Sequence, residues 1–184
     1  MLFSKWQGLG NDFVIVNGFT EQISDYAQTA VKVCDRHFGI GADGLVVVLP
    51  SAIADFKMRI FNSDGSEAEM CGNVTRCVAR YVYEYGLTDK AELTIETLAG
   101  IIRPQLIFAD DGSVAEVKVD MGEPRLRRHE IPMGGEATDT AIAVPLEVDG
   151  TVYNITAVSM GNPHCVIFVD DIGTIDLPAV GPKI

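Results

Sequence analysis

The sequence lacks the marks of a membrane-spanning or secreted protein. No apolar run among its 184 residues approaches the roughly 18–20 residues that a membrane-spanning helix needs, so we expect no such helix. The first residues contain neither an apolar segment nor a small-residue cleavage site, so we expect no secretory signal.

Basic residues are also scarce. The chain has 14 Lys and Arg against 26 Asp and Glu, which gives a formal net charge of −12. Nucleic acid or an anionic membrane surface would first meet repulsion from this charge. We therefore expect neither as a partner.

Cysteine and histidine are sparse. The four cysteines form no CxxC pair and are too few for a disulfide scaffold. The three histidines, His37, His129 and His164, lie far apart, which disfavours a zinc site. We expect no metal, and free thiols in a reducing, cytoplasmic compartment.

The chain is rich instead in short strand-like runs. Hydrophobic residues make up 47% of it, enough for a real core. Runs of Val and Ile, broken by Gly, Asp and Pro, predict many strands. The turn sequences Asp110-Asp111-Gly112 and Asp149-Gly150 predict hairpins. The runs are Phe13–Val16, Leu45–Leu49, Phe56–Phe61, Leu93–Leu98, Ile101–Phe108, Val114–Val119, Ala141–Val148, Val152–Val158 and Val166–Val169.

Two segments have helical period. The first is predicted over Asp25–Phe38, with a capping box at its start and Gly39 as its C-terminal glycine. The second runs from Cys71 or Asn73 to Tyr85 and stops at Gly86, with one apolar stripe along it. Many strands with few helices predict the α+β class.

The length allows one domain or two small ones, and a boundary near residues 120–140 is the place that composition favours. Residues 125–139 are polar, with Pro and paired Gly, and read as a linker or long loop near the boundary. Gly10-Asn11 and Gly161-Asn162 each precede an apolar run. This echo is either common turn chemistry or a sign of duplicated domains. In a duplication, the second copy would stop before its counterpart of Cys71.

The segment 61–77 (FNSDGSEAEMCGNVTRC) is the best candidate for chemistry. It places Cys71-Gly72-Asn73 at a helix start, where the dipole and unpaired N–H groups favour a thiolate and bind anions. Gly72 has no Cβ, so a ligand can approach the backbone. The alternative is that Cys71 simply begins the buried helix stripe. Cys34 and Cys77 are expected to be packing residues.

Polar residues at strand ends form a second group of candidates. Asn11, Asn62 and Asn162 either bind a substrate's amino and carboxylate groups or cap turns. His164 follows Asn162-Pro163 and is either a site imidazole or a turn residue. It is a poor catalytic partner for Cys165, since neighbours on a strand point to opposite faces. The glycine-rich stretch 39–44 follows a helix and precedes a strand, the wrong order for a nucleotide loop.

Four segments together resemble the diaminopimelate epimerase family of cofactor-independent racemases and epimerases. They are GLGNDFVIV (8–16), RHFGIGADGL (36–45), FNSDGSEAEMCGN (61–73) and MGNPHCVIFVDD (160–171). The resemblance implies two pseudo-symmetric domains, each with a curved mixed sheet around a central helix. Members are longer, and each domain supplies one cysteine to a cleft. We therefore expect a first domain over 1–120 and the beginning of a second, incomplete domain over 121–184. The second cysteine is expected to lie outside this sequence.

The resemblance also implies the chemistry. LL-diaminopimelate would become the meso form, in lysine and peptidoglycan-precursor synthesis, with no pyridoxal phosphate or other cofactor. One thiolate removes the α-proton and the opposite thiol returns one to the other face. Cys71 matches the first cysteine, and His164 a histidine that assists. The matched substrate-binding positions are Asn11, Asn62, Gly72, Asn73 and Asn162. The full-length protein would be a homodimer.

Two positions depart from the family pattern. Val74 stands where the family usually has glycine, and its side chain is expected either to crowd the anion cradle or to limit its backbone, although its N–H stays available. Gly44 stands where some members use glutamine to reach the substrate. Two other functions stay open: a substrate-binding module without turnover, if 184 residues is the whole product, and a sister isomerase acting on another small acid.

Overall fold

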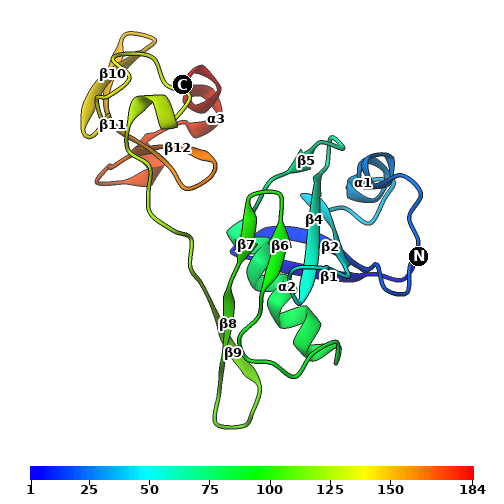
Figure 1. Ribbon diagram of the computed structural model, residues 1–184. Helices are drawn as coiled ribbons and strands as arrows, with labels where there is room; N and C mark the ends of the chain where they lie inside the picture. Colours follow the sequence, from blue (N-terminus) through cyan, green and yellow to red (C-terminus); the bar gives the residue numbers. More distant parts are fainter. The chain divides into compact units, whose positions relative to one another are not determined.

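The chain folds into two compact units. The computed structural model describes residues 1–184, which divide into Met1–Met121 and Gly122–Ile184. The first unit contains a seven-stranded and a two-stranded sheet, and the second contains a three-stranded sheet (Figure 1). None of the helices is long and apolar enough to cross a membrane.

The first unit is built on a seven-stranded mixed sheet with the order β1-β2-β3-β4-β6-β7, and β5 pairs with β4. The pairs β2·β3 and β4·β6 are parallel, and the others are antiparallel. A separate hairpin, β8–β9, completes the unit. The strands are β1 (Ser4–Gly8), β2 (Asn11–Asn17), β3 (Gly44–Leu49), β4 (Phe56–Asn62), β5 (Glu67–Ala68), β6 (Ile95–Thr97), β7 (Gly100–Ile102), β8 (Pro104–Phe108) and β9 (Val114–Val119).

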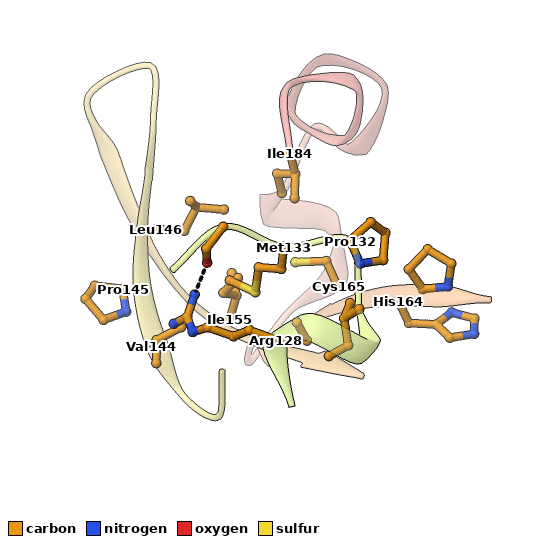
Figure 2. Close-up of a pocket in the computed structure, with 14 residues that line it drawn as sticks. Arg128, Pro132, Met133, Val144, Pro145, Leu146, Ile155, His164, Cys165 and Ile184 are labelled. Carbon is orange, nitrogen blue, oxygen red and sulfur yellow. Dashed lines mark hydrogen bonds between the residues drawn. The ribbon is translucent and has the colours of Figure 1, made fainter. Parts of the chain in front are cut away.

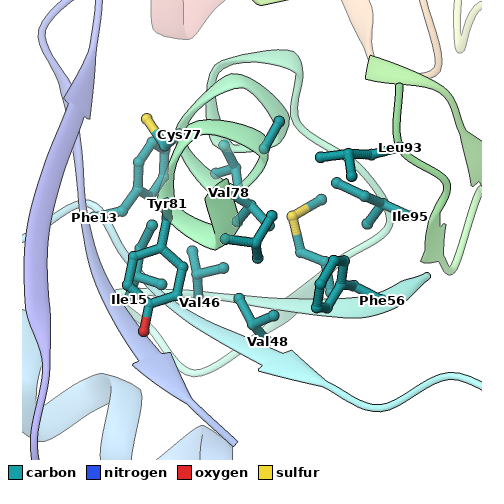
Figure 3. Packing of buried hydrophobic residues seen from close by; sticks show 14 of the residues in the cluster. Phe13, Ile15, Val46, Val48, Phe56, Cys77, Val78, Tyr81, Leu93 and Ile95 are labelled. Atoms are coloured by element: carbon teal, nitrogen blue, oxygen red, sulfur yellow. The ribbon is translucent and has the colours of Figure 1, made fainter. Parts of the chain in front are cut away.

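Each face of this sheet buries its own set of side chains. Because strand neighbours alternate between faces, Phe13 and Ile15 of β2 join one core while Val14 and Val16 join the other. Helix α2 (Gly72–Glu84) packs on the first face and is also in contact with β8 and β9. Helix α1 (Tyr26–Cys34) covers the second face. Figure 3 shows α2 at the centre of the first core.

Both ends of α2 follow the sequence prediction. Cys71 is the N-cap residue, with extended backbone at φ −147° and ψ 120°. At the other end the N–H of Gly86, at φ +67°, donates to Tyr83 O, and the N–H of Leu87 donates to Val82 O. This pair of bonds is a Schellman motif, which satisfies the last carbonyls of the helix. The buried face is wider than the predicted stripe, although Tyr85 at its end is exposed.

Helix α1 differs from its prediction. Asp25 caps it by accepting the Gln28 N–H at 2.9 Å, as expected, but the helix ends at Cys34 and not at Phe38. Gly39 is not a left-handed C-terminal glycine. A Cβ at Gly39 would stand 2.2 Å from Lys32 O, so glycine is required there by close packing against backbone. The left-handed residue is Gly41, at φ +80°.

Three strand predictions also need correction. Strands β1 and β5 were missed, and the single run Ile101–Phe108 is two strands separated at Arg103. Strand β1 joins β2 through Leu9 and Gly10, both with positive φ (+56° and +85°), which makes a tight two-residue hairpin. The hairpins at 110–112 and 149–150 are confirmed.

The second unit contains a three-stranded antiparallel sheet in the order β10-β11-β12. A small core of Ile131, Ala141 and Ala157 lies against it. Residues 125–139 all belong to this unit. Isolated backbone β-bridges tie this segment to the sheet region, one between Arg125 and Ser159 and one between Arg127 and Thr140. The elements are η1 (Arg128–Glu130), β10 (Val144–Val148), β11 (Thr151–Ser159), β12 (Pro163–Ile167), η2 (Ile172–Thr174), α3 (Leu177–Val180) and η3 (Gly181–Lys183). Few helices beside these sheets confirm the α+β class.

Candidate active site

One end of the first unit's sheet gathers the candidate residues of that unit. Strand β2 begins at Asn11, the parallel strand β3 begins at Gly44, and the antiparallel strand β4 ends at Asn62. The Ser63 N–H donates to the carbonyl of Asp43 at 3.2 Å, which ties the end of β4 to the start of β3. The start of α2 joins this end through contacts of its first residues with Asn11.

Cys71 presents a half-buried thiol at the start of α2. Its side chain makes no capping bond to the helix, and its sulfur lies 3.9 Å from Asn11 Oδ1. The first N–H groups of α2 have no acceptor inside the helix, so they can bind an anion beside this sulfur. The alternative, that Cys71 simply begins the buried stripe of the helix, holds in part. The Cys71 side chain packs against the edge of the core but is not buried within it.

The other cysteines of this unit differ from Cys71. Cys34 and Cys77 are buried, and burial raises the pKa of both thiols. A thiol in this state is a poor nucleophile and base. The prediction that these two residues serve packing is confirmed by their places in the two cores.

Two amides link Cys71 to charged groups. Asn73 Nδ2 lies 3.5 Å from Asn11 Oδ1, and Asn73 Oδ1 accepts from the Arg76 guanidinium. Asn11 Nδ2 donates to Asp43 Oδ2 at 2.6 Å. The structure therefore brings Asn11, Cys71 and Asn73 together.

A cluster of four charged residues lies behind Asn11. Arg36 bridges Asp12 at 2.8 Å and Asp43 at 2.7 Å, and Lys5 lies 2.8 Å from Asp12. The Arg36 guanidinium, with help from Lys5, holds the pKa of Asp12 well below its usual range. Asp12 and Asp43 in turn raise the pKa of Arg36 above its already high value. Asp12 and Arg36 are therefore charged at neutral pH.

The remaining candidates of this unit have local partners. Asn62 is exposed, and its Nδ2 donates to Ser66 Oγ at 2.9 Å. A Cβ at Gly72 would stand 3.1 Å from the Met121 sulfur, so the flexible thioether of Met121 lies against this glycine. Gly44 lies where a Cβ would stand 2.9 Å from Phe61 O, which restricts this position to glycine.

Val74 does not crowd the anion cradle. Its side chain is fully buried in the core between α2 and the sheet. The expectation of crowding was wrong because the side chain of this first-turn residue points away from the free N–H groups and into the protein.

Asn162 and His164 belong to the second unit. His164 Nε2 lies 3.1 Å from Asn162 Oδ1, and both residues are exposed. His164 and Cys165 also line a hollow of about 610 Å³ on this unit, among mostly apolar side chains (Figure 2). The one cation of the lining, Arg128, donates to Gly134 O at 2.7 Å.

Sequence reasoning missed Asp43 and Arg36. Both lie in the family motif 36–45, but only its glycine-rich part, 39–44, was considered from the residues themselves, and it was rejected as a nucleotide loop. Their alignment with Asn11 depends on the parallel pairing of β2 with β3, which no local pattern reveals. The sequence did offer one signal for Asp43, because it is a charged residue directly before the buried strand β3.

This fold has counterparts among solved structures. The chain matches a hydroxyproline epimerase from Agrobacterium vitis with a TM-score of 0.66 and 16% identity, over 93% of this chain and 52% of that one. The two proteins therefore share a fold, in which this chain has a thiol at the start of α2.

Sequence comparison identifies the family within this fold. The family model for diaminopimelate epimerase matches residues 3–127. Diaminopimelate epimerases from Pelotomaculum thermopropionicum and Moorella thermoacetica are each 56% identical to this chain, over 186 and 185 residues. Both matches cover 100% of this chain and 66% of the relative's own length. The chain belongs to the diaminopimelate epimerase family.

Proposed function

We propose that this chain carries one acid/base half of an epimerase that inverts the α-carbon of LL-diaminopimelate to give the meso form. The carrying observation is the Cys71 thiol at the start of α2, half-buried, beside unpaired helix N–H groups and the amides of Asn11 and Asn73. Membership of the family supports this substrate and its place in lysine and peptidoglycan-precursor synthesis.

In the proposed reaction the Cys71 thiolate removes the α-proton. The C–H bond breaks, its electron pair stays on the α-carbon, and charge spreads onto the adjacent carboxylate. The free N–H groups at the start of α2 stabilise this negative charge. A thiol on the opposite face of the carbon then delivers a proton and inverts the centre, and the two thiols exchange roles in the reverse direction.

The polar residues around Cys71 serve to hold the substrate. Gly72 and Asn73 supply backbone N–H groups for a carboxylate, and Asn11 and Asn62 supply side-chain amides. From the family motifs we also propose that Asn162 binds substrate and that His164 assists the reaction. We further propose that no cofactor takes part, and that the full-length protein is a homodimer in the cytoplasm, where its free thiols stay reduced.

Exchange of the substrate α-proton with deuterium in D₂O tests the role of Cys71. The wild-type chain is expected to introduce deuterium, which needs only one base, and Cys71→Ala to abolish this exchange. Cys165→Ala removes an exposed thiol of the other unit and is the matched control, with exchange retained. Wild-type exchange rates in Cys71→Ala would overturn the assignment.

Inversion is followed separately by chiral chromatography, because it also requires an acid on the opposite face. Calorimetric binding of diaminopimelate without any exchange by the wild-type chain would instead identify a substrate-binding module. Sedimentation of the full-length protein tests the proposed dimer.

A further inference from the structure

The amide of Asn11 lies between a carboxylate and a thiol. On one side Asn11 Nδ2 is 2.6 Å from Asp43 Oδ2. On the other side Asn11 Oδ1 is 3.9 Å from the Cys71 sulfur and 3.5 Å from Asn73 Nδ2. Every polar atom of this side chain therefore has a partner. The nitrogen of the amide faces a carboxylate, and its oxygen faces a thiol and a second amide.

The chemistry of Asp43 decides which way this amide points. An ionised carboxylate only accepts hydrogen bonds, whereas an asparagine side chain has one accepting and one donating end. Asn11 must therefore turn its NH₂ group to Asp43 and its oxygen to Cys71. The opposite rotamer would place two acceptors 2.6 Å apart and leave the amide nitrogen toward the sulfur.

Asp43 is itself firmly held. Its Oδ1 accepts from Arg36 at 2.7 Å, its Oδ2 accepts the Asp12 N–H at 3.0 Å, and its own N–H donates to Asp12 O at 2.9 Å. Lys5 closes the cluster by binding Asp12 and the carbonyl of Gly41. Charge-assisted bonds of this kind are the stronger hydrogen bonds of proteins.

We propose that Asp43 is a positioning residue, which fixes the orientation of the Asn11 amide so that Cys71 faces an acceptor and not a donor. The wild-type arrangement then binds the S–H form of Cys71, the proton-carrying state of the thiol. The inference rests on the proposed function for the role of this thiol, but not for the orientation of the amide.

Replacing Asp43 by asparagine weakens the constraint, because the new amide can turn its nitrogen to Asn11 and donate to it, in exchange for the bond that Oδ2 accepts from the Asp12 N–H. Asn11 can then turn its NH₂ group to Cys71 and stabilise the thiolate. We expect Asp43→Asn to raise the rate of Cys71 alkylation by iodoacetamide at neutral pH about fivefold, the effect of one ordinary hydrogen bond. The rate is read by mass spectrometry of the Cys71 peptide, from about pH 6 to about pH 9, where ordinary thiols titrate.

The chain provides its own controls in the same samples. Cys34 and Cys77 are buried and react only when the unit unfolds, and exposed Cys165 reports the reactivity of the reagent. If Asp43→Asn exposes the buried thiols, Asp43→Ser takes its place, since a hydroxyl also both donates and accepts. The expected acceleration is the same.

A second background separates orientation from charge. The charged groups that face Cys71 do so through the two amides: Asp43 with Arg36 and Asp12 behind Asn11, and Arg76 behind Asn73. In an Asn11→Ala background, Asp43→Asn should cause no further acceleration. Asp12→Asn removes the same charge from the cluster but leaves the acceptor of Asn11 in place, and should change the rate much less.

Three results would overturn the inference: an unchanged Cys71 rate in a folded Asp43 variant, equal acceleration in the Asn11→Ala background, or equal acceleration in Asp12→Asn. None of these measurements uses diaminopimelate. They are therefore separate from the deuterium exchange, whose failure would remove the proposed function but leave the orientation of Asn11 intact.

Discussion

Replacing Val74 by glycine, the residue usual at this place in the family, should destabilise the first unit strongly. The side chain of Val74 is fully buried at the third position of α2. Loss of a buried valine side chain costs about 1.5–3 kcal/mol, and the cavity left behind adds to it. Glycine in a helix costs up to about 1 kcal/mol more. We expect the free energy of unfolding to fall by about 3 kcal/mol.

Urea unfolding measured by tryptophan fluorescence tests this value in the first unit alone. Trp6 is the only tryptophan, and its ring meets that of Tyr81 of α2 edge-on at 6.0 Å. Val31→Gly is the matched control, because Val31 lies in α1 but is 47% exposed. Val31→Gly should lower the free energy of unfolding by less than about 1 kcal/mol, which is the effect of glycine on helix propensity alone. Equal losses in the two variants would show that Val74 does not pack in the core as described.

Two further predictions concern this unit. Gly39→Ala places a Cβ 2.2 Å from Lys32 O and should lower the free energy of unfolding by about 3 kcal/mol or more. Gly86→Ala, at φ +67° with open space around it, should lower it by about 1 kcal/mol. Similar urea midpoints for the two variants would contradict this difference. Because Arg36 lowers the pKa of folded Asp12, the ion pair contributes stability above the unfolded carboxyl pKa of about 4 and loses it as the pH falls below that value. Asp12→Asn should therefore lose less stability than the wild type on acidification, and parallel curves would argue against the ion pair.

Local signals account for the parts of the fold that were predicted well. The start and end of α2 depend on Cys71 and Gly86, and the hairpin at 149–150 depends on two residues with positive φ. Caps and tight turns are made by residues within a few positions of one another, so their patterns are visible in the sequence. Strand β1 was missed because its two-residue turn, Leu9-Gly10, lacks the Asn-Gly or Asp-Gly signal of such hairpins, and β5 was missed because it has only 2 residues.

The candidate site divides in the same way. Cys71, Asn11 and Asn73 were recognisable from helix-start and turn chemistry and from the family motifs. The direction of the Val74 side chain was not, because a residue in the first turn of a helix can face either the cradle or the core. The packing of α2 against the sheet decided it.

The sequence by itself determined the α+β class, the family and the thiol at the helix start, since each depends on residues close together in the chain. Only the tertiary structure decided that Asp43, 32 positions from Asn11, orients its amide toward Cys71. The physical reason is that parallel pairing of β2 with β3 aligns the starts of two strands that are separated in sequence by a whole helix. A carboxylate placed there acts through a hydrogen bond that neither segment forms alone.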